Sequence, residues 1–360
     1  MRVDAVRGTN FRCYRRLELA LQPGLVGVVG PNGAGKTSLL ELIHFGCLGY
    51  SPRTSNDRRL VTFDAQVLRA EVDALLASGP VSAAVGYAPG EPKRATLDGA
   101  PVRTIERLLP RFPVLVFTPD RLRLVQGPPA LRRSYFDRVV VRLWPALAQL
   151  PAEYARALAQ RNHLLRRVRA GATGPAALDP WDELVARSGS ALSAARGRLC
   201  SRLGPGLAER MRELGGEPPA DPLRLHGDGP AAEPELLAAL RERRGRDIDR
   251  ASTGAGPHLD DYELVDGGRD LRQFGSQGEQ RRVLLALILA EADLIEAERD
   301  EQPLLLLDDV TGEFDAGRRS LLLDAVGRFQ QALLTTTDAA DLGDAPAAVI
   351  TVRDATVRIA

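Results

Sequence analysis

Short, wholly apolar runs alternate with helical periodicity along the 360 residues of this chain. The runs at 25–29, 114–117 and 304–307 are typical of strands that are buried on both faces of a parallel sheet. From Pro119 to about residue 250, apolar positions instead recur at the spacing of amphipathic helices. The pattern therefore predicts α/β structure at both ends of the chain and a helical segment between them.

The sequence also marks the boundaries of several elements. Asp179 stands directly before Pro180, and this pair predicts the N-cap and the first position of a long helix. A cluster of Gly, Pro and Asp at 214–234 predicts a loop, whereas residues 60–118 are mostly strand-like. The remaining predicted elements are helices over 38–45, 130–170 and 281–299 and strands over 333–334 and 349–352.

Composition excludes several classes of protein. The hydrophobic fraction of 44% can form a sizeable core, and the charged fraction of 26% is ordinary for a globular protein. No apolar run reaches the roughly 20 residues of a membrane span, and the first residues form no apolar leader. Three widely spaced cysteines match neither a disulfide framework nor a zinc motif. We therefore expect a soluble, cytoplasmic protein.

Basic residues are distributed unevenly, although 48 basic and 47 acidic side chains nearly cancel. Between Arg132 and Arg169 there are nine arginines and two acids, and the segment 119–253 carries a net charge of +7. Such asymmetry is a weak indication of a polyanionic partner, and a solvated helix surface explains it equally well. Lys36 and Lys93 are the only lysines in the sequence, so Lys36 is not part of a lysine-rich background.

The clearest chemical motif follows the first buried strand. It matches Gly-x-x-x-x-Gly-Lys-Thr in the strand–loop–helix context of a phosphate-binding P-loop. Glycines let backbone N–H groups curve around phosphates, and the helix N-terminus adds its positive dipole end. Lys36 is expected to reach the β- and γ-phosphates and to act in catalysis, and Thr37 to ligate Mg²⁺. The predicted ATP-binding residues of this motif are Gly30, Pro31, Asn32, Gly33, Ala34, Gly35, Lys36, Thr37 and Ser38.

A second motif lies in the last hundred residues, where the apolar run at 304–307 ends in two aspartates. Asp308 is expected to hold Mg²⁺ through its water shell. Asp309 stands where a catalytic carboxylate would polarise the attacking water. This Walker B pattern is common by itself and becomes specific because it accompanies a P-loop.

A third motif, Ser276-Gln277-Gly278, precedes the long apolar helix. It resembles the signature motif of ABC-type ATPases, in which the serine and the glycine face the γ-phosphate of ATP on a second protomer. A simple helix cap at Ser276 is the alternative. Lys36 and Ser276 are 240 residues apart, which indicates that a helical, arginine-rich segment is inserted between them. That layout is similar to the SMC-like DNA-repair ATPases.

Within that branch, five blocks of the sequence narrow the match. They are Asn-Phe-Arg-Cys-Tyr at 10–14, Ser-Pro-Arg-Thr at 51–54, Phe-Thr-Pro-Asp at 117–120, the Gly-Pro-Pro-Ala-Leu-Arg-Arg block at 127–133 with Asp137, and Gly-Pro-His-Leu-Asp-Asp at 256–261. The blocks occur in the right order and cover the whole chain, and with them the chain resembles the RecF family of bacterial recombination mediators.

The resemblance implies an α/β fold with an ABC/SMC-type P-loop ATPase head, formed by 1–118 and 254–360, and an inserted α-helical arm, 119–253. It implies a weak, DNA-dependent ATPase that uses ATP and Mg²⁺, dimerises head to head on binding ATP, and binds duplex DNA and single-strand/double-strand junctions. With RecR and RecO, such a protein supports RecA loading at gaps, in DNA replication, DNA damage repair and the SOS response. Slow hydrolysis would reset the dimer.

Three further residues are candidates for the nucleotide site. Arg12 is expected to contact ATP, with a salt bridge as the alternative. Gln126 is expected to act as a Q-loop residue that senses Mg²⁺ and the γ-phosphate, with a surface glutamine as the alternative. Asp315 is expected to belong to a D-loop that crosses the dimer interface, or to cap a helix.

The inserted arm offers candidate DNA contacts. Arg161, Arg166 and Arg167 are predicted to bind duplex phosphates, since no interleaved aromatic residues suggest base stacking. Their alternative is to pair with acids across the arm.

Three departures from the usual motifs bear on activity. Asp309 replaces the glutamate that usually follows the Walker B aspartate, Thr335–Asp338 stands where a switch histidine is usual, and Leu259 replaces an expected arginine. The first two make fast hydrolysis doubtful and leave ATP binding unaffected. A non-hydrolysing scaffold, a P-loop kinase, and an ATPase subunit of an ABC-type assembly that does not act on DNA, such as a transporter, are the alternatives.

Overall fold

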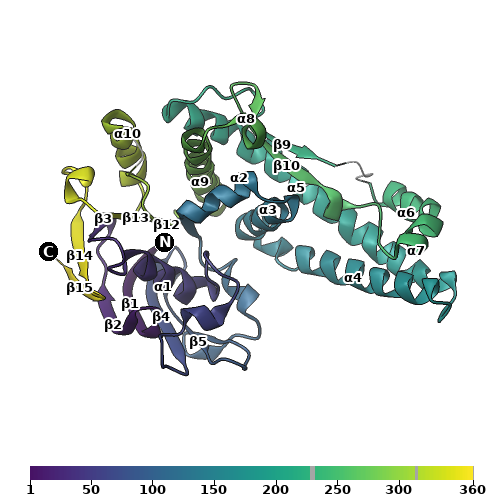
Figure 1. The fold of residues 1–360 in the computed structure, drawn as a ribbon, viewed down its shortest axis with the longest axis horizontal. Coiled ribbons are helices and arrows are strands. Elements are labelled where there is room, and N and C mark those ends of the chain that lie inside the picture. The colour runs from purple at the N-terminus through teal and green to yellow at the C-terminus, as the bar shows by residue number, and fades with distance from the viewer. Residues whose placement is uncertain (228–231, 313–314, 360) are drawn as a thin grey trace. The chain divides into compact units, whose positions relative to one another are not determined.

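The computed structural model describes residues 1–227, 232–312 and 315–359, which form two compact units (Figure 1). The boundaries differ from the predicted ones: 119–122 and 209–217 belong to the unit that contains the P-loop, and 254–276 belongs to the helical unit. The first unit comprises Met1–Leu122, Glu209–Glu217 and Gln277–Ala360, and the second comprises Arg123–Ala208 and Pro218–Ser276.

The N-terminal part of the first unit forms an antiparallel sheet of six strands. Its first two strands make a tight hairpin, in which Phe11 pairs with Tyr14. Along the strand Leu68–Leu76, buried and more exposed residues alternate, so one face of the sheet packs inward. The order across the sheet is β2 (Tyr14–Ala20), β1 (Arg2–Phe11), β4 (Leu68–Leu76), β5 (Gly79–Tyr87), β6 (Arg94–Leu97) and β7 (Ala100–Pro101).

A second six-stranded sheet combines strands from both ends of the chain. β3, which leads into the P-loop, pairs in parallel with β13 on one side and with β14 on the other. β12 and β8 continue the parallel part, and β15 pairs antiparallel to β14 at the edge. The order is β15 (Thr356–Ile359), β14 (Ala348–Arg353), β3 (Gly24–Val29), β13 (Gln331–Thr336), β12 (Leu304–Leu307) and β8 (Val114–Phe117).

Helix α1 (Lys36–Leu48) connects the two sheets. It contacts β1, β4 and β5 of the antiparallel sheet and β8, β12 and β13 of the parallel sheet (Figure 1). Because it is enclosed in this way, even its polar residues Glu41 and His44 are buried. α9 (Gln277–Arg299) and α10 (Ala316–Gly327) also pack on the parallel sheet.

None of the described helices of the chain combines the length and the apolar character that crossing a bilayer requires.

The second unit is mainly helical and carries a small antiparallel sheet. The helices are α2 (Arg123–Gln126), α3 (Pro129–Leu143), α4 (Leu150–Arg169), α5 (Asp179–Glu213, in this unit up to Ala208), α6 (Glu233–Glu242), α7 (Arg244–Arg250) and α8 (Leu271–Phe274). The strands are β9 (Leu223–His226), β10 (Asp261–Asp266) and β11 (Arg269–Asp270).

The predicted continuous helix over 130–170 is wrong. α3 ends at Leu143, and α4 begins only at Leu150. Trp144 leaves the helical region (φ −124°, ψ 83°) because the ring of Pro145 disfavours helical angles in the residue before it. The proline therefore divides one amphipathic pattern into two helices.

The predicted loop at 214–234 contains a strand. β9 pairs antiparallel to β10, with Leu223 opposite Leu264 and His226 opposite Asp261. Residues 228–231 of the predicted loop lie outside the described residues. A four-residue strand whose partner lies almost 40 residues away leaves little local pattern, so the sequence did not reveal it.

The predicted N-cap at Asp179 is also wrong. Pro175 opens a 3₁₀ turn, Pro175–Leu178, which runs directly into α5, and Asp179 itself has helical angles (φ −55°, ψ −49°). Its carboxylate accepts a hydrogen bond from Arg244 at 2.6 Å instead of capping the helix. The prediction fails because helical structure begins four residues earlier.

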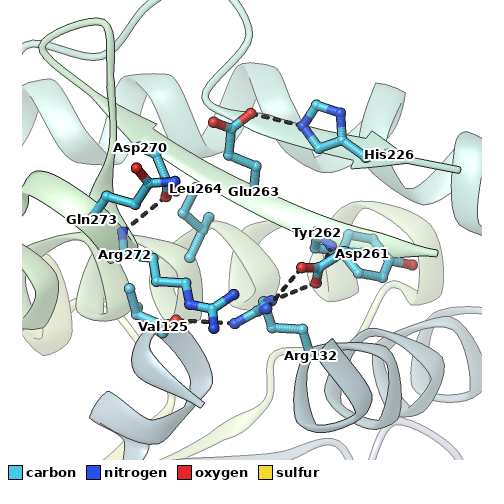
Figure 2. Close-up of a pocket in the computed structure, with 10 residues that line it drawn as sticks. All are labelled: Val125, Arg132, His226, Asp261, Tyr262, Glu263, Leu264, Asp270, Arg272 and Gln273. Atoms are coloured by element: carbon cyan, nitrogen blue, oxygen red, sulfur yellow. Dashed lines mark hydrogen bonds and ion pairs between the residues drawn. The ribbon is translucent and has the colours of Figure 1, made fainter. Parts of the chain in front are cut away.

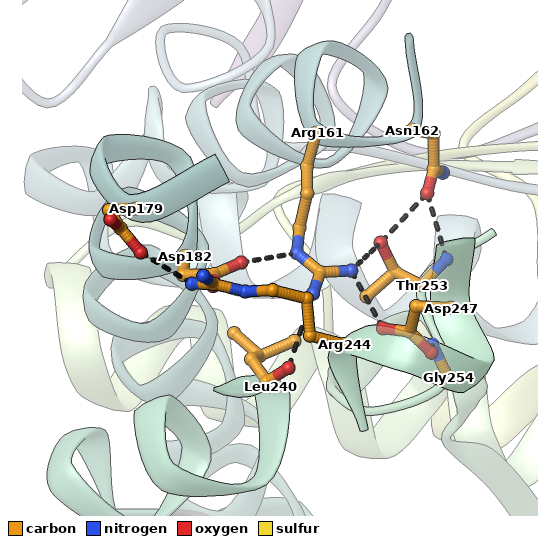
Figure 3. A network of polar contacts seen from close by, with 9 residues as sticks. All are labelled: Arg161, Asn162, Asp179, Asp182, Leu240, Arg244, Asp247, Thr253 and Gly254. Atoms are coloured by element: carbon orange, nitrogen blue, oxygen red, sulfur yellow. Dashed lines mark hydrogen bonds and ion pairs between the residues drawn. The ribbon is translucent and has the colours of Figure 1, made fainter. Parts of the chain in front are cut away.

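The second unit encloses an apolar core and a buried ionic network (Figure 3). The network centres on Arg161 of α4, whose side chain is 0% exposed. Its Nε donates to Asp182 of α5 at 2.7 Å, and its Nη1 donates to Asp247 of α7 and to Thr253, each at 2.8 Å. The apolar core comprises Tyr154, Ala157, Val185, Ala186, Leu192, Leu236, Leu240 and Ala255.

The burial of Arg161 corrects one predicted DNA contact. A guanidinium that is enclosed by two carboxylates and a hydroxyl cannot reach a phosphate on the surface, so this prediction is wrong. The alternative, pairing with acids across the arm, describes Arg161. Arg166 and Arg167 are exposed on the same helix, and their contact with DNA stays a prediction.

We expect Arg161→Met to lower the free energy of unfolding by about 3–5 kcal/mol, because Asp182 and Asp247 would lose their buried cationic partner. Arg167→Met is the matched control, since the same change at an exposed position of α4 should cost less than about 0.5 kcal/mol. Urea denaturation measures both variants. An Arg161→Met protein as stable as the parent would contradict this role for the network.

Candidate functional site

The P-loop connects β3 to α1 in the first unit, as the sequence predicts. Lys36 is the first residue of α1, and Gly35 precedes it at φ 116°, a backbone angle that favours glycine. The first N–H groups of a helix have no partner within the helix, and they carry the positive end of its dipole. The loop therefore presents donors in the arrangement that binds phosphate.

Gly30 opens the loop at a point of close backbone approach. A Cβ atom at this position would lie 2.1 Å from the carbonyl oxygen of Val352 in β14. No other residue fits here without moving β14. A cavity of about 470 Å³ lies beside this contact, lined by Val29, Gly30, Pro31, Thr337, Thr351, Arg353 and Asp354.

Lys36 folds back on its own loop. Its Nζ donates to the carbonyl oxygens of Gly30 at 2.6 Å and Pro31 at 3.0 Å. Burial lowers the pKa of Lys36, and the nearby carboxylates of Asp309 and Asp308 oppose that shift. These neutral carbonyl partners leave most of its positive charge available to phosphate oxygens.

Thr37 and Asp308 meet although they are 271 residues apart in the chain. Thr37 Oγ1 donates to Asp308 Oδ1 at 2.9 Å, and Thr335 Oγ1 donates to the same oxygen at 2.8 Å. Burial raises the pKa of Asp308, and the two threonine hydrogen bonds oppose that shift. A hydroxyl and a carboxylate beside a phosphate-binding loop fit Mg²⁺, which prefers oxygen ligands and keeps few protein contacts.

Asp309 lies beside this pair but faces solvent. Its backbone is left-handed (φ 51°), and its N–H donates to Thr335 Oγ1 at 2.9 Å. A non-glycine residue with this angle is strained, and such strain is frequent at functional positions. Thr335 therefore touches both acids, through the side chain of Asp308 and the backbone of Asp309.

Arg12 binds a buried carboxylate on α1. Its Nε and Nη2 donate to the two oxygens of Glu41 at 2.8 Å each, and Ser51 donates to Glu41 at 2.5 Å. Arg53 lies 3.7 Å from the same carboxylate. The salt bridge considered for Arg12 is present, and its contact with ATP stays a prediction.

The remaining predicted residues lie at element ends. Ser276 directly precedes α9, and all three signature residues, Ser276, Gln277 and Gly278, are exposed. Gln126 ends α2 in the second unit. Asp315 caps α10 by accepting from the N–H of Arg318 at 2.9 Å, while its neighbours at 313–314 lie outside the described residues. These positions leave the roles of all five residues as predictions.

Sequence reasoning missed the roles of Thr335 and Glu41, and it names Ser51 only within the block at 51–54. Thr335 was noted only as part of a segment that lacks the usual histidine, and its position at the end of a strand parallel to β12 is the signal that could have placed it beside Asp308. A carboxylate five residues after the P-loop lysine, between the apolar residues Leu40 and Leu42, could have drawn attention to Glu41.

The second unit holds a cavity of about 280 Å³ (Figure 2). Arg132 enters it from α3 and binds Asp261 with two hydrogen bonds of 2.6 and 2.8 Å, and His226 lies 2.7 Å from Glu263. Acidic and basic side chains both line this cavity, so it offers no surface of one charge. Among the described residues of the chain, no cluster of three or more His, Cys, Asp or Glu could hold a metal ion.

Comparisons with known proteins agree with this geometry. A family model described as an AAA domain matches residues 5–79. The DNA replication and repair protein RecF of Heliobacterium modesticaldum is 36% identical over 344 residues, which cover 94% of this chain and 92% of that protein.

Solved structures extend the similarity to the fold. A structure of the recombination mediator protein RecF with ATP, in the RecFOR pathway, has a TM-score of 0.90 and 26% identity over 99% of this chain and 97% of that chain. An Smc head bound to the C-winged helix domain of ScpA has a TM-score of 0.59 at 14% identity, over 100% of this chain and 97% of that chain. The predicted ABC/SMC-type ATPase fold is thereby confirmed, and this chain belongs to the RecF family of DNA replication and repair proteins.

Proposed function

We propose that this protein is an ATP-dependent, DNA-binding recombination mediator. It binds Mg-ATP in the head, closes a head-to-head dimer on duplex DNA at gaps, and supports RecA loading with RecR and RecO. Slow ATP hydrolysis then resets the dimer. The observation that carries the proposal is the hydrogen bond of 2.9 Å between Thr37 and Asp308, because it joins the P-loop to the Walker B strand in a chain related to RecF over 94% of its length.

Nucleotide binding exchanges weak internal contacts for stronger ones. Lys36 gives up the carbonyls of Gly30 and Pro31 and donates to the β- and γ-phosphates, where charge-assisted hydrogen bonds are stronger. The N–H groups at the start of α1 bind the α- and β-phosphates of the same nucleotide. The helix and the lysine thus act on one anionic group without a large rearrangement.

Thr37 and Asp308 would hold the cation that accompanies the nucleotide. Thr37 would supply its hydroxyl oxygen, Asp308 its carboxylate, and Thr335 would orient that carboxylate through its hydrogen bond. When bound, Mg²⁺ supplies positive charge to the β- and γ-phosphate oxygens. Asp308 must be ionised for this role, and the two hydroxyl donors favour that form.

Asp309 is the proposed general base for hydrolysis. Its carboxylate is exposed beside the site, and the hydrogen bond from its N–H to Thr335 fixes the backbone from which it projects. An aspartate reaches one methylene less far than the usual glutamate, so the water is held less well and turnover is slow. Slow turnover suits a switch in which ATP binding does the mechanical work.

The signature residues support an ATP-closed dimer. Ser276, Gln277 and Gly278 are exposed at the start of α9, where a helix N-terminus can bind the γ-phosphate of a second protomer. We propose that ATP completes its site only between two heads, and that Asp315 belongs to the same interface.

The exposed side of α4 is the proposed DNA-binding face. Arg156 and Arg167 are exposed and stand eleven residues apart, which is about three helical turns, so they lie on one side of the helix. Arg166 is exposed beside Arg167. Such a face binds phosphates irrespective of sequence.

Replacing the P-loop lysine tests nucleotide binding. Lys36→Met should weaken Mg-ATP binding by at least about a hundredfold, because two charge-assisted hydrogen bonds to phosphate are removed. Equilibrium titration with fluorescent ATP measures this. Lys93→Met, at the chain's other lysine, is the matched control and should bind like the parent. Unchanged affinity in Lys36→Met would refute the nucleotide site.

Blocking the signature motif tests the dimer. Ser276→Arg should leave ATP binding by the monomer within about twofold and abolish ATP-dependent dimerisation, since the long side chain would fill the space of the partner's γ-phosphate. Light scattering with a slowly hydrolysed ATP analogue measures the mass. Ser201→Arg places the same residue on an exposed position of α5 and should dimerise normally. If Ser276→Arg also dimerises, Ser276 is only a helix cap.

Charge reversal on α4 tests the DNA face. The double variant Arg166→Glu/Arg167→Glu should weaken duplex binding and reduce the log–log salt slope by roughly 2, at about 0.9 for each phosphate that the variant no longer neutralises. Fluorescence anisotropy at several salt concentrations measures both, with ATP affinity and the melting temperature recorded in parallel.

The matched control for this experiment is Arg15→Glu/Arg16→Glu, which makes the same change of charge on exposed positions of β2. It should bind duplex DNA like the parent. If the control loses binding and the α4 variant keeps it, the DNA face lies on the head.

A further inference from the structure

Two hairpins from opposite ends of the chain hold consecutive carbonyl groups of the P-loop. At the tip of the β1–β2 hairpin, the hydroxyl of Tyr14 donates to the carbonyl oxygen of Gly35 at 3.0 Å. At the tip of the β14–β15 hairpin, the N–H of Ala355 donates to the carbonyl oxygen of Ala34 at 3.1 Å. The contact of Tyr14 is made by its side chain, whereas that of Ala355 is made by its backbone. A mutation can therefore remove the Tyr14 contact.

The orientation of a carbonyl fixes the N–H of the same peptide group. The peptide bonds of the described chain are trans, so the C=O of Gly35 and the N–H of Lys36 point in opposite directions. The Gly35 oxygen accepts from Tyr14 and also from the N–H of Leu39 at 2.9 Å. With two donors on this oxygen, the N–H of Lys36 is directed away from them, toward the space that the loop encloses.

Gly35 needs such support because its own backbone is permissive. At φ 116° it lies in a region that glycine enters and leaves with little steric cost. The peptide group that joins Gly35 to Lys36 can therefore rotate unless another group restrains it. A restrained N–H binds phosphate more tightly than a mobile one, since the ordering cost is met before the ligand arrives.

Tyr14 is built for this contact. It is 1% exposed, and a Cβ atom at Gly35 would lie 2.8 Å from its hydroxyl oxygen, so the ring packs directly against the loop. Burial raises the pKa of Tyr14, which keeps the phenol protonated and able to donate at any physiological pH. A ring buried in this way cannot stack on the adenine base.

We infer that Tyr14 is a positioning residue of the nucleotide site, which holds the Gly35 peptide so that the N–H of Lys36 faces the phosphates. The inference rests on the proposed function, because it assigns a role within the same ATP site. The N–H groups of a P-loop bind the α- and β-phosphates, which ADP and ATP share. The contribution of Tyr14 should consequently be equal for the two nucleotides.

Tyr14→Phe tests this role, since it removes one hydroxyl and keeps the ring. The dissociation constants for Mg-ATP and Mg-ADP should both rise by about three- to tenfold, as expected for the removal of one hydrogen bond. In steady-state hydrolysis, KM should rise by a similar factor while kcat stays within about twofold. A purely structural effect would lower kcat through loss of folded protein and leave KM unchanged.

Two controls make the result decisive. Tyr154→Phe removes an equally buried hydroxyl, hydrogen-bonded to His258 at 2.7 Å in the second unit, and should leave both dissociation constants unchanged. Melting temperatures are recorded for both variants, and binding is measured at 10 °C so that Tyr14→Phe is assayed as folded protein.

The outcomes separate this inference from the proposed function. Parent protein that binds ATP, Lys36→Met that does not, and Tyr14→Phe with raised dissociation constants support both. Tyr14→Phe that binds ATP and ADP like the parent overturns the role of Tyr14 and leaves the proposed function intact. Parent and Lys36→Met with equal ATP affinity would overturn the proposed function itself.

Discussion

The nucleotide site depends on the pairing of β3 with two strands that lie beyond residue 330. β13 and β14 flank β3, and the backbone of β14 comes so close to Gly30 that only glycine fits. The loop that follows β3 therefore acquires its shape when both ends of the chain meet. The segment between the P-loop and β12 must therefore fold without preventing that encounter. Long-range parallel pairing of this kind is also slow to form.

The two units use charge in opposite ways. In the head, Lys36 rests on neutral carbonyls and Thr37 rests on Asp308, so a nucleotide and its cation can replace these partners at little cost. In the helical unit, Arg161 is enclosed by Asp182 and Asp247, and removing Arg161 takes a buried cationic partner from both carboxylates. Exchangeable contacts suit binding, whereas permanent ones fix the arrangement of α4, α5 and α7. The same residue type, arginine, is therefore an exposed side chain proposed to bind phosphate at Arg167 and a buried structural element at Arg161.

Contiguous features could be predicted from the sequence, and features that depend on distant partners could not. The strands at 25–29 and 304–307, with the P-loop between strand and helix, carry their pattern within a few residues. The burial of Arg161 depends on Asp182 and Asp247, which no spacing rule connects to it. β9 likewise exists because β10 pairs with it. The break before Pro145 was visible in the sequence, but the amphipathic pattern on both sides of it hid the boundary.

Thr335 shows how a residue that fits no motif can organise two that do. Its hydroxyl donates to Asp308 and accepts from the N–H of Asp309, so one side chain on β13 sets the relation between the two acids that follow β12. β13 also pairs with β3, which leads into the P-loop. A shift of β13 would thus move the phosphate loop, the carboxylate proposed to hold the cation and the proposed base together. Under the proposed function, this strand would link nucleotide binding at the loop to hydrolysis at Asp309.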